Sequence, residues 1–149
     1  MSGTFLYLDS SALVKLVAPE AESAALLESL AAWPVRLSSE LARVEVVRAA
    51  RRATSHPEAE KRAEEVISGL YLIKIDGEIL GRAARLEPRT LRSLDAVHLA
   101  SALSLGEDLG AIVVYDNNMA TAAAGCGLRV VAPGPAVASG GGDDAARQP

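Results

Sequence analysis

Short apolar segments with β-strand character alternate with segments of helical periodicity along most of this sequence. Runs of bulky or β-branched apolar residues predict strands, and apolar residues spaced three or four positions apart predict helices. The predicted strands cover residues 5–8, 35–37, 71–75, 111–115 and 129–131. The predicted helices cover residues 12–17, 20–32, 40–54, 57–68, 77–86, 91–105 and 119–124. Strands separated by helices pair in parallel through crossover connections, so the sequence predicts an α/β fold with a mainly parallel sheet covered on both faces.

The size and composition of the chain fit one cytoplasmic globular domain. With 149 residues and 50% hydrophobic content, the chain can bury a core but is too short for two catalytic modules. We expect one domain over residues 1–134 and a flexible, Gly-rich tail over 135–149. The net charge of −4 argues against binding nucleic acid through bulk charge. The single cysteine and apolar runs far shorter than the ~20 residues of a membrane span indicate a reducing, cytoplasmic setting without a membrane.

Four acidic residues lie inside apolar segments, where a charge is costly. Asp9 and Asp116 each follow a predicted strand and precede a predicted helix, whereas Glu45 and Asp95 lie early in predicted helices. Open α/β sheets bind ligands at the carboxyl ends of their strands, so we expect all four acids at that edge. Four carboxylates together require compensation, which favours a hard divalent cation with oxygen ligands, Mg²⁺ or Mn²⁺. Such an ion suits phosphodiester hydrolysis because it orients the phosphate and activates a water.

Polar residues beside these acids are candidates for supporting roles. Ser11 lies two positions after Asp9, and Asn117 directly follows Asp116. Either side chain is placed to hydrogen-bond a carboxylate ligand or a substrate phosphate. Asn118 is an equivalent candidate beside Asp116, and a helix cap is the alternative role of Ser11.

Four segments, taken in order, resemble the motifs of PIN-domain ribonucleases, and among them the VapC toxins of bacterial toxin–antitoxin pairs. The matching segments are residues 7–15, 38–45, 94–100 and 113–116, within a resemblance that covers about 5–131. The resemblance implies a PIN-like three-layer α/β/α fold and an endoribonuclease toxin that hydrolyses RNA phosphodiesters and leaves a 5′-phosphate. It implies homodimers and inhibition by a VapB-type antitoxin. It further implies a supporting role for Ser11 and a Mg²⁺ or Mn²⁺ site formed by Asp9, Glu45, Asp95 and Asp116.

Simpler structural interpretations exist for the residues that follow strands and for a nearby histidine. Asp9 and Asp116 would serve as ordinary N-caps of the helices that follow them. His98 lies on the predicted helix of Asp95, and we interpret it as a satisfied core or interface histidine rather than a site residue.

Arginines offer ion-pair partners for the two helical acids. Glu45 would pair with Arg48 or Arg52 on the same helix, and Asp95 would pair with Arg92. The chain has two groups of arginines, which are interpreted either as solvated faces or as contacts for RNA phosphates or antitoxin carboxylates. They are Arg43, Arg48, Arg51 and Arg52, and Arg82, Arg85, Arg89 and Arg92.

Two other functions fit parts of this pattern. An aspartyl-phosphate enzyme of the haloacid-dehalogenase or receiver type also has an Asp after its first strand, but Ser11 occupies the position where the phosphatase needs a second Asp. A non-catalytic PIN-like module that acts through dimerisation or protein binding is the alternative from a different functional class. Failure of the purified protein to bind metal would favour that module.

Overall fold

The computed structural model describes residues 3–135, and a sheet of five parallel strands forms the centre of that range. The strands are β1 (Phe5–Leu8), β2 (Val35–Ser39), β3 (Tyr71–Ile73), β4 (Leu109–Val113) and β5 (Val130–Val131). Their order across the sheet is β3-β2-β1-β4-β5, and every neighbouring pair is parallel. The chain order therefore reverses between β1 and β4, which is the position where such sheets bind ligands.

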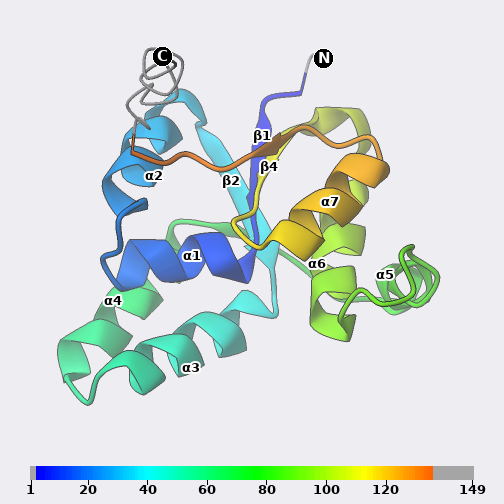
Figure 1. Ribbon diagram of the computed structural model, residues 1–149. Coiled ribbons are helices and arrows are strands. Elements are labelled where there is room, and N and C mark those ends of the chain that lie inside the picture. The colour runs from blue at the N-terminus through cyan, green and yellow to red at the C-terminus, as the bar shows by residue number, and fades with distance from the viewer. Residues whose placement is uncertain (1–2, 136–149) are drawn as a thin grey trace, which may run out of the picture.

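Helices cover both faces of this sheet (Figure 1). They are α1 (Ser10–Val17), α2 (Ser23–Ser29), α3 (Ala42–Ala53), α4 (Pro57–Ser68), α5 (Gly77–Ala83), α6 (Ser93–Leu103) and α7 (Asn117–Gly125), with 3₁₀ turns η1 (Leu30–Ala32) and η2 (Gly106–Asp108). Helices α1 to α4 pack on one face, and α5 to α7 lie on the other. The predicted three-layer α/β/α fold with a parallel sheet is confirmed.

Strand β1 contributes to both apolar layers because successive side chains of a strand point to opposite faces. Leu6 and Leu8 belong to the core shared with α1, α3 and α4. Tyr7 belongs to the opposite core, with residues of α6 and α7. A strand buried on both faces has an uninterrupted apolar sequence, as residues 5–8 do. The same alternation directs the Tyr7 side chain towards α6.

The bounds of β4 differ from the prediction for a tertiary reason. The predicted strand covers residues 111–115, whereas β4 begins at Leu109 and pairs with β1 along its length. Its second residue, Gly110, has no strand propensity. A Cβ added there would lie 2.5 Å from Cζ3 of Trp33, so only glycine fits against that ring. Pairing with β1 and close packing against Trp33 therefore extend β4 towards its N-terminus. The segment predicted as one helix over 20–32 is α2 followed by η1.

The predicted tail, residues 135–149, lies outside the described residues from position 136 onwards. The predicted boundary of the single domain at residue 134 therefore stays a prediction. Among the described helices, none is long and apolar enough to cross a membrane.

Candidate active site

The carboxyl edge of the sheet holds two of the predicted site residues. Asp9 follows β1 directly, and Asp116 follows β4 after a short loop. Asp9 Oδ1 accepts a hydrogen bond from the Ala12 N–H at 3.0 Å. Asp116 Oδ2 accepts one from the Met119 N–H at 2.9 Å. The N-cap interpretation is therefore confirmed for both residues. Capping occupies one oxygen of each carboxylate, and the other oxygen receives no hydrogen bond from the described residues.

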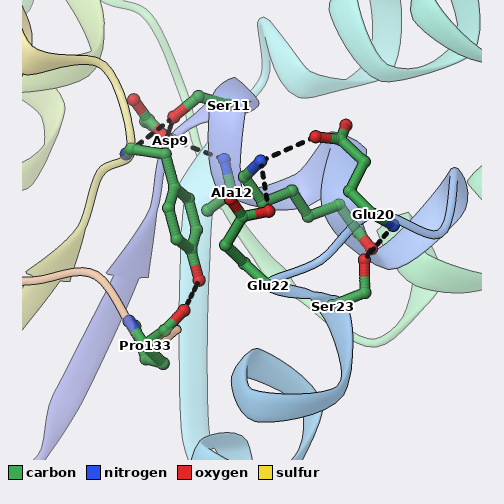
Figure 2. Close-up of polar contacts among 9 residues, drawn as sticks. Asp9, Ser11, Ala12, Glu20, Glu22, Ser23 and Pro133 are labelled. Atoms are coloured by element: carbon green, nitrogen blue, oxygen red, sulfur yellow. Dashed lines mark hydrogen bonds and ion pairs between the residues drawn. The ribbon is translucent and has the colours of Figure 1, made fainter. Parts of the chain in front are cut away.

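Asp9 is almost fully buried and is held by Ser11 (Figure 2). Asp9 is 3% exposed, and burial raises its pKa from 3.8 to about 6 against the opposing hydrogen bonds from Ser11 and Ala12. Ser11 Oγ donates to Asp9 Oδ1 at 2.6 Å and accepts from the Tyr115 N–H at 3.1 Å. The alternative role of Ser11 as a helix cap is not found, because Asp9 occupies the N-cap of α1. The Ser11 hydroxyl instead links the segment that follows β1 to the segment that follows β4.

Helices on opposite faces of the sheet bring the other two acids to the same edge. Glu45 lies in the first turn of α3, and Asp95 lies in the first turn of α6. Burial raises the pKa of Asp95, and the charges of Asp116 and Glu45 raise it further. The charge of Asp95 in turn contributes to the raised pKa of Asp9. The four carboxylates are therefore close enough to repel one another, and we call them the acidic cluster.

The arginine ion pairs that are the structural alternative for these acids are not found among the described residues. Asp95 makes no ion pair there, although the positive charge of Arg92 lowers its pKa. Glu45 Oε1 lies 2.6 Å from His98 Nε2 instead of pairing with Arg48 or another arginine of α3. This alternative is wrong for Glu45, because a residue from another helix contacts its carboxylate.

His98 is buried, as predicted, with 1% of the residue exposed. Its Nδ1 lies 2.7 Å from the Tyr7 hydroxyl, and its Nε2 contacts Glu45. Sequence reasoning missed this link between the core and the acidic cluster. One signal for it is present, because residues three apart on a helix share a face, and His98 follows Asp95 at that spacing.

A cleft of about 720 Å³ lies beside the acidic cluster. Acidic and basic side chains both line it, together with Ser11. The acids are Glu20, Glu45, Asp95 and Asp116, and the bases are Lys15, Arg48, Arg52 and Arg92. The carboxyl group of Asp9 is nearly enclosed, and its hydrogen-bond partner Ser11 reaches the cleft wall. Arginines beside a group of carboxylates suit an anionic substrate that a cation bridges to the protein.

Lys15 does not compensate the acidic cluster, because it forms ion pairs with Glu20 and Glu22, the two glutamates labelled in Figure 2. Its Nζ lies 2.8 Å from Glu20 Oε2 and 3.1 Å from Glu22 Oε2, and 4.8 Å from the centre of the Tyr115 ring. Burial lowers the pKa of Lys15, but the two glutamates raise it by more. The lysine therefore keeps its charge and forms ion pairs within the α1–α2 connection.

The donor atoms of the acidic cluster are of the chemical type that a hard divalent cation binds. Within residues 3–135, no three Asp, Glu, His or Cys side chains are placed so as to hold a metal ion. The cluster nevertheless offers carboxylate oxygens, which are the ligands that Mg²⁺ and Mn²⁺ prefer. Burial raises the pKa values of Asp9 and Asp95, and a nearby cation would relieve this cost. The donors therefore fit such an ion in their chemical type.

Asn117 is not brought into this site. It is the first residue of α7 and is exposed, and it does not line the cleft. Its backbone carbonyl accepts a hydrogen bond from Thr121 Oγ1, and its side chain makes no hydrogen bond with the described residues. We therefore leave Asn117 out of the site that we propose below.

Comparisons with known proteins agree with the fold. A family model described as the PIN domain matches residues 6–125. Ribonuclease VapC46 of Mycobacterium tuberculosis is 44% identical over 128 residues, which cover 86% of this chain and 97% of the relative. Ribonuclease VapC35 of the same species is 41% identical over 138 residues, covering 88% and 98%. A chain of a toxin-antitoxin complex from Klebsiella pneumoniae shares the fold, with a TM-score of 0.65, 24% identity and coverage of 86% and 97%. The chain belongs to the PIN-domain family, among the VapC proteins.

Proposed function

We propose that this chain is the toxin of a toxin–antitoxin pair and that it cuts RNA internally with the help of Mg²⁺ or Mn²⁺. Similarity to Ribonuclease VapC46, at 44% identity over 86% of this chain, supports ribonuclease activity. One observation carries the metal-dependent mechanism. Four carboxylates from separate segments gather at the point where the strand order reverses, even though the pKa values of Asp9 and Asp95 are raised there. Groups that repel one another in a cleft favour a functional explanation over a structural one.

Each group in the cleft then has a role that its surroundings allow. When bound, Mg²⁺ or Mn²⁺ orients the scissile phosphate, activates a water and neutralises charge on the attacking and leaving oxygens. Asp9, Glu45, Asp95 and Asp116 would hold the ion. Ser11 restricts the orientation of the Asp9 carboxylate through its 2.6 Å hydrogen bond.

The arginines of the cleft fit the polyanionic character of RNA. Arg48, Arg52 and Arg92 line the cleft beside the acidic cluster, and none of them forms an ion pair with the described residues. Guanidinium groups bind phosphates through paired hydrogen bonds, so these residues would hold the phosphates on either side of the scissile one. The chain has one Trp, three Tyr and one Phe, which favours backbone contacts over base stacking.

The proposed assembly and partners follow from the family. We propose a homodimer that acts in the cytoplasm on RNA and is inhibited by a VapB-type antitoxin. The structural neighbour from Klebsiella pneumoniae comes from a toxin-antitoxin complex, which supports a protein partner of this kind.

The sharpest test separates a metal ligand from an ordinary N-cap. Asp116 and Asp76 are both N-caps that accept one backbone hydrogen bond at 2.9 Å, but Asp76 caps α5 and does not line the cleft. Asn caps helices as well as Asp does, so neither Asp116→Asn nor Asp76→Asn should unfold the protein. We expect Asp116→Asn to abolish Mn²⁺-dependent cleavage of RNA and Asp76→Asn to retain it.

Two results would contradict the proposal. Cleavage that continues undiminished in EDTA would exclude the metal-dependent mechanism, and equal activity of both Asn variants would reduce Asp116 to a cap. Absence of both cleavage and Mn²⁺ binding in the wild-type protein would favour the alternative, a non-catalytic PIN-like module that acts through dimerisation or protein binding.

A further inference from the structure

A continuous chain of hydrogen bonds runs from the centre of the sheet to the acidic cluster. The Tyr7 hydroxyl lies 2.7 Å from His98 Nδ1, and His98 Nε2 lies 2.6 Å from Glu45 Oε1. Tyr7 comes from β1, His98 from α6 and Glu45 from α3, so three separate elements contribute. The Tyr7 and His98 rings also pack edge to face, with centroids 5.9 Å apart and an interplanar angle of 75°.

These hydrogen bonds pass through an otherwise apolar layer, where burying a polar group costs stability unless the group is hydrogen-bonded. Tyr7 is 0% exposed and His98 is 1% exposed, and Tyr7 belongs to a buried apolar cluster that includes Leu99 and Met119. Two apolar side chains of similar size would fill this space without any need for partners. Only the Glu45 end of the chain, with 20% of its side chain exposed, reaches the cleft. The contact with Glu45 therefore explains best why Tyr7 and His98 occupy this layer.

The bonding rules of the three groups fix the direction of the chain. An ionised carboxylate only accepts hydrogen bonds, so His98 Nε2 must carry the hydrogen that faces Glu45. Burial raises the pKa of Tyr7, so its hydroxyl keeps its hydrogen and can donate it to His98 Nδ1. An imidazole with its hydrogen on Nε2 then satisfies both neighbours at once. Tyr7 fixes the tautomer and the ring orientation of His98, and His98 fixes one oxygen of Glu45.

We propose that Tyr7 and His98 are positioning residues that hold the Glu45 carboxylate in place for the acidic cluster. This inference rests on the proposed function. A glutamate has three rotatable side-chain bonds, and Arg48 on the next turn of α3 lines the same cleft. Without the hydrogen bond from His98, Glu45 would turn towards that arginine as i, i+3 pairs do, and would leave the cluster. Outer groups that orient a metal ligand act in this way.

The test compares two substitutions of His98 with a control on the same helix. His98→Leu removes both hydrogen bonds, whereas His98→Gln keeps an N–H donor near the position of Nε2. Leu99→Val changes the neighbouring residue, which is 0% exposed but has no link to Glu45. Folded full-length proteins are compared for Mn²⁺ binding by electron paramagnetic resonance and for RNA cleavage at saturating Mn²⁺.

We expect His98→Leu to weaken Mn²⁺ binding roughly ten- to hundredfold, the usual effect of removing an outer partner of a metal ligand. At saturating Mn²⁺, kcat should fall while KM for RNA stays constant, because Glu45 acts on the ion rather than on the RNA. His98→Gln should recover most of the loss, and Leu99→Val should bind Mn²⁺ like the wild type. Folded His98→Leu protein with wild-type Mn²⁺ affinity, or an equal loss in Leu99→Val, would overturn the proposal.

A spectroscopic measurement separates this proposal from the function on which it rests. The chain has two histidines, and the other, His56, is exposed, so ¹⁵N-labelled imidazole signals can be assigned. We expect the hydrogen of His98 on Nε2, and a shift of that signal in Glu45→Gln. Hydrogen on Nδ1 alone would refute the hydrogen-bond chain itself. Wild-type protein that shows the expected tautomer but binds no Mn²⁺ would instead refute the metal-dependent function.

Discussion

Replacing Asp9 with Asn should stabilise the protein while it abolishes cleavage. Asp9 is 3% exposed, and burial raises its pKa from 3.8 to about 6. A raised pKa means that the folded state holds the proton more tightly than the unfolded state, so ionisation of Asp9 costs stability. The difference of about 2 pKa units corresponds to about 3 kcal/mol at pH 7. Asn carries no charge, and its Oδ1 can still accept the hydrogen bonds from Ser11 and Ala12.

The pH dependence of this gain gives it a distinct signature. The cost of the charge is absent below the ordinary pKa of 3.8, grows as the pH rises to about 6, and is complete above that value. The Asp9→Asn variant should therefore exceed the wild type by about 3 kcal/mol at pH 7, or roughly 6–12 °C in Tm, and by little near pH 4. Mn²⁺ at 100 times its Kd should stabilise the folded wild type by about 2.7 kcal/mol and should not stabilise the variant.

Urea unfolding of both proteins, without metal and across this pH range, measures the gain directly, and a gel assay with Mn²⁺ measures cleavage. A variant that is less stable than the wild type at pH 7 without metal would refute the reasoning. So would a stability difference that stays constant down to pH 4, because the charge of Asp9 would then not be its cause.

Three further predictions use other contacts of the site and the sheet. Ser11→Ala should lose about 1–3 kcal/mol of stability in urea unfolding and slow cleavage, because the Tyr115 N–H loses its acceptor and Asp9 loses its donor; unchanged stability and rate would contradict this. Mn²⁺ binding should weaken roughly tenfold per pH unit below about pH 6, as Asp9 takes up a proton, and an affinity constant from pH 7 to pH 5 would argue against Asp9 as a ligand. Gly110→Ala should lower the stability by about 1–3 kcal/mol, because its Cβ would lie 2.5 Å from both the Trp33 ring and the Gly3 carbonyl oxygen, and an unchanged Tm would contradict this close packing.

The main features of the fold could be predicted because they are encoded locally. The uninterrupted apolar run of β1 and the helical periodicities around it indicate a parallel sheet with two helical layers before any contact is known. The position of Asp9 and Asp116 after strands is local information as well, and the general geometry of parallel sheets places both at one edge. Element ends were less predictable, since the start of β4 depends on pairing with β1 and on the close approach of Gly110 to Trp33.

The partners of the acidic cluster depend on contacts between distant segments. Spacing along α3 favours an ion pair between Glu45 and Arg48, yet Glu45 contacts His98, which lies 53 residues away in the sequence. Tyr7 meets the same histidine across 91 residues. No local periodicity carries such pairings, because they arise only when the packing of α3 and α6 against the sheet brings the three side chains together. The residues that gather at the site could therefore be named from the sequence, whereas the hydrogen bonds that orient them depend on how the layers pack.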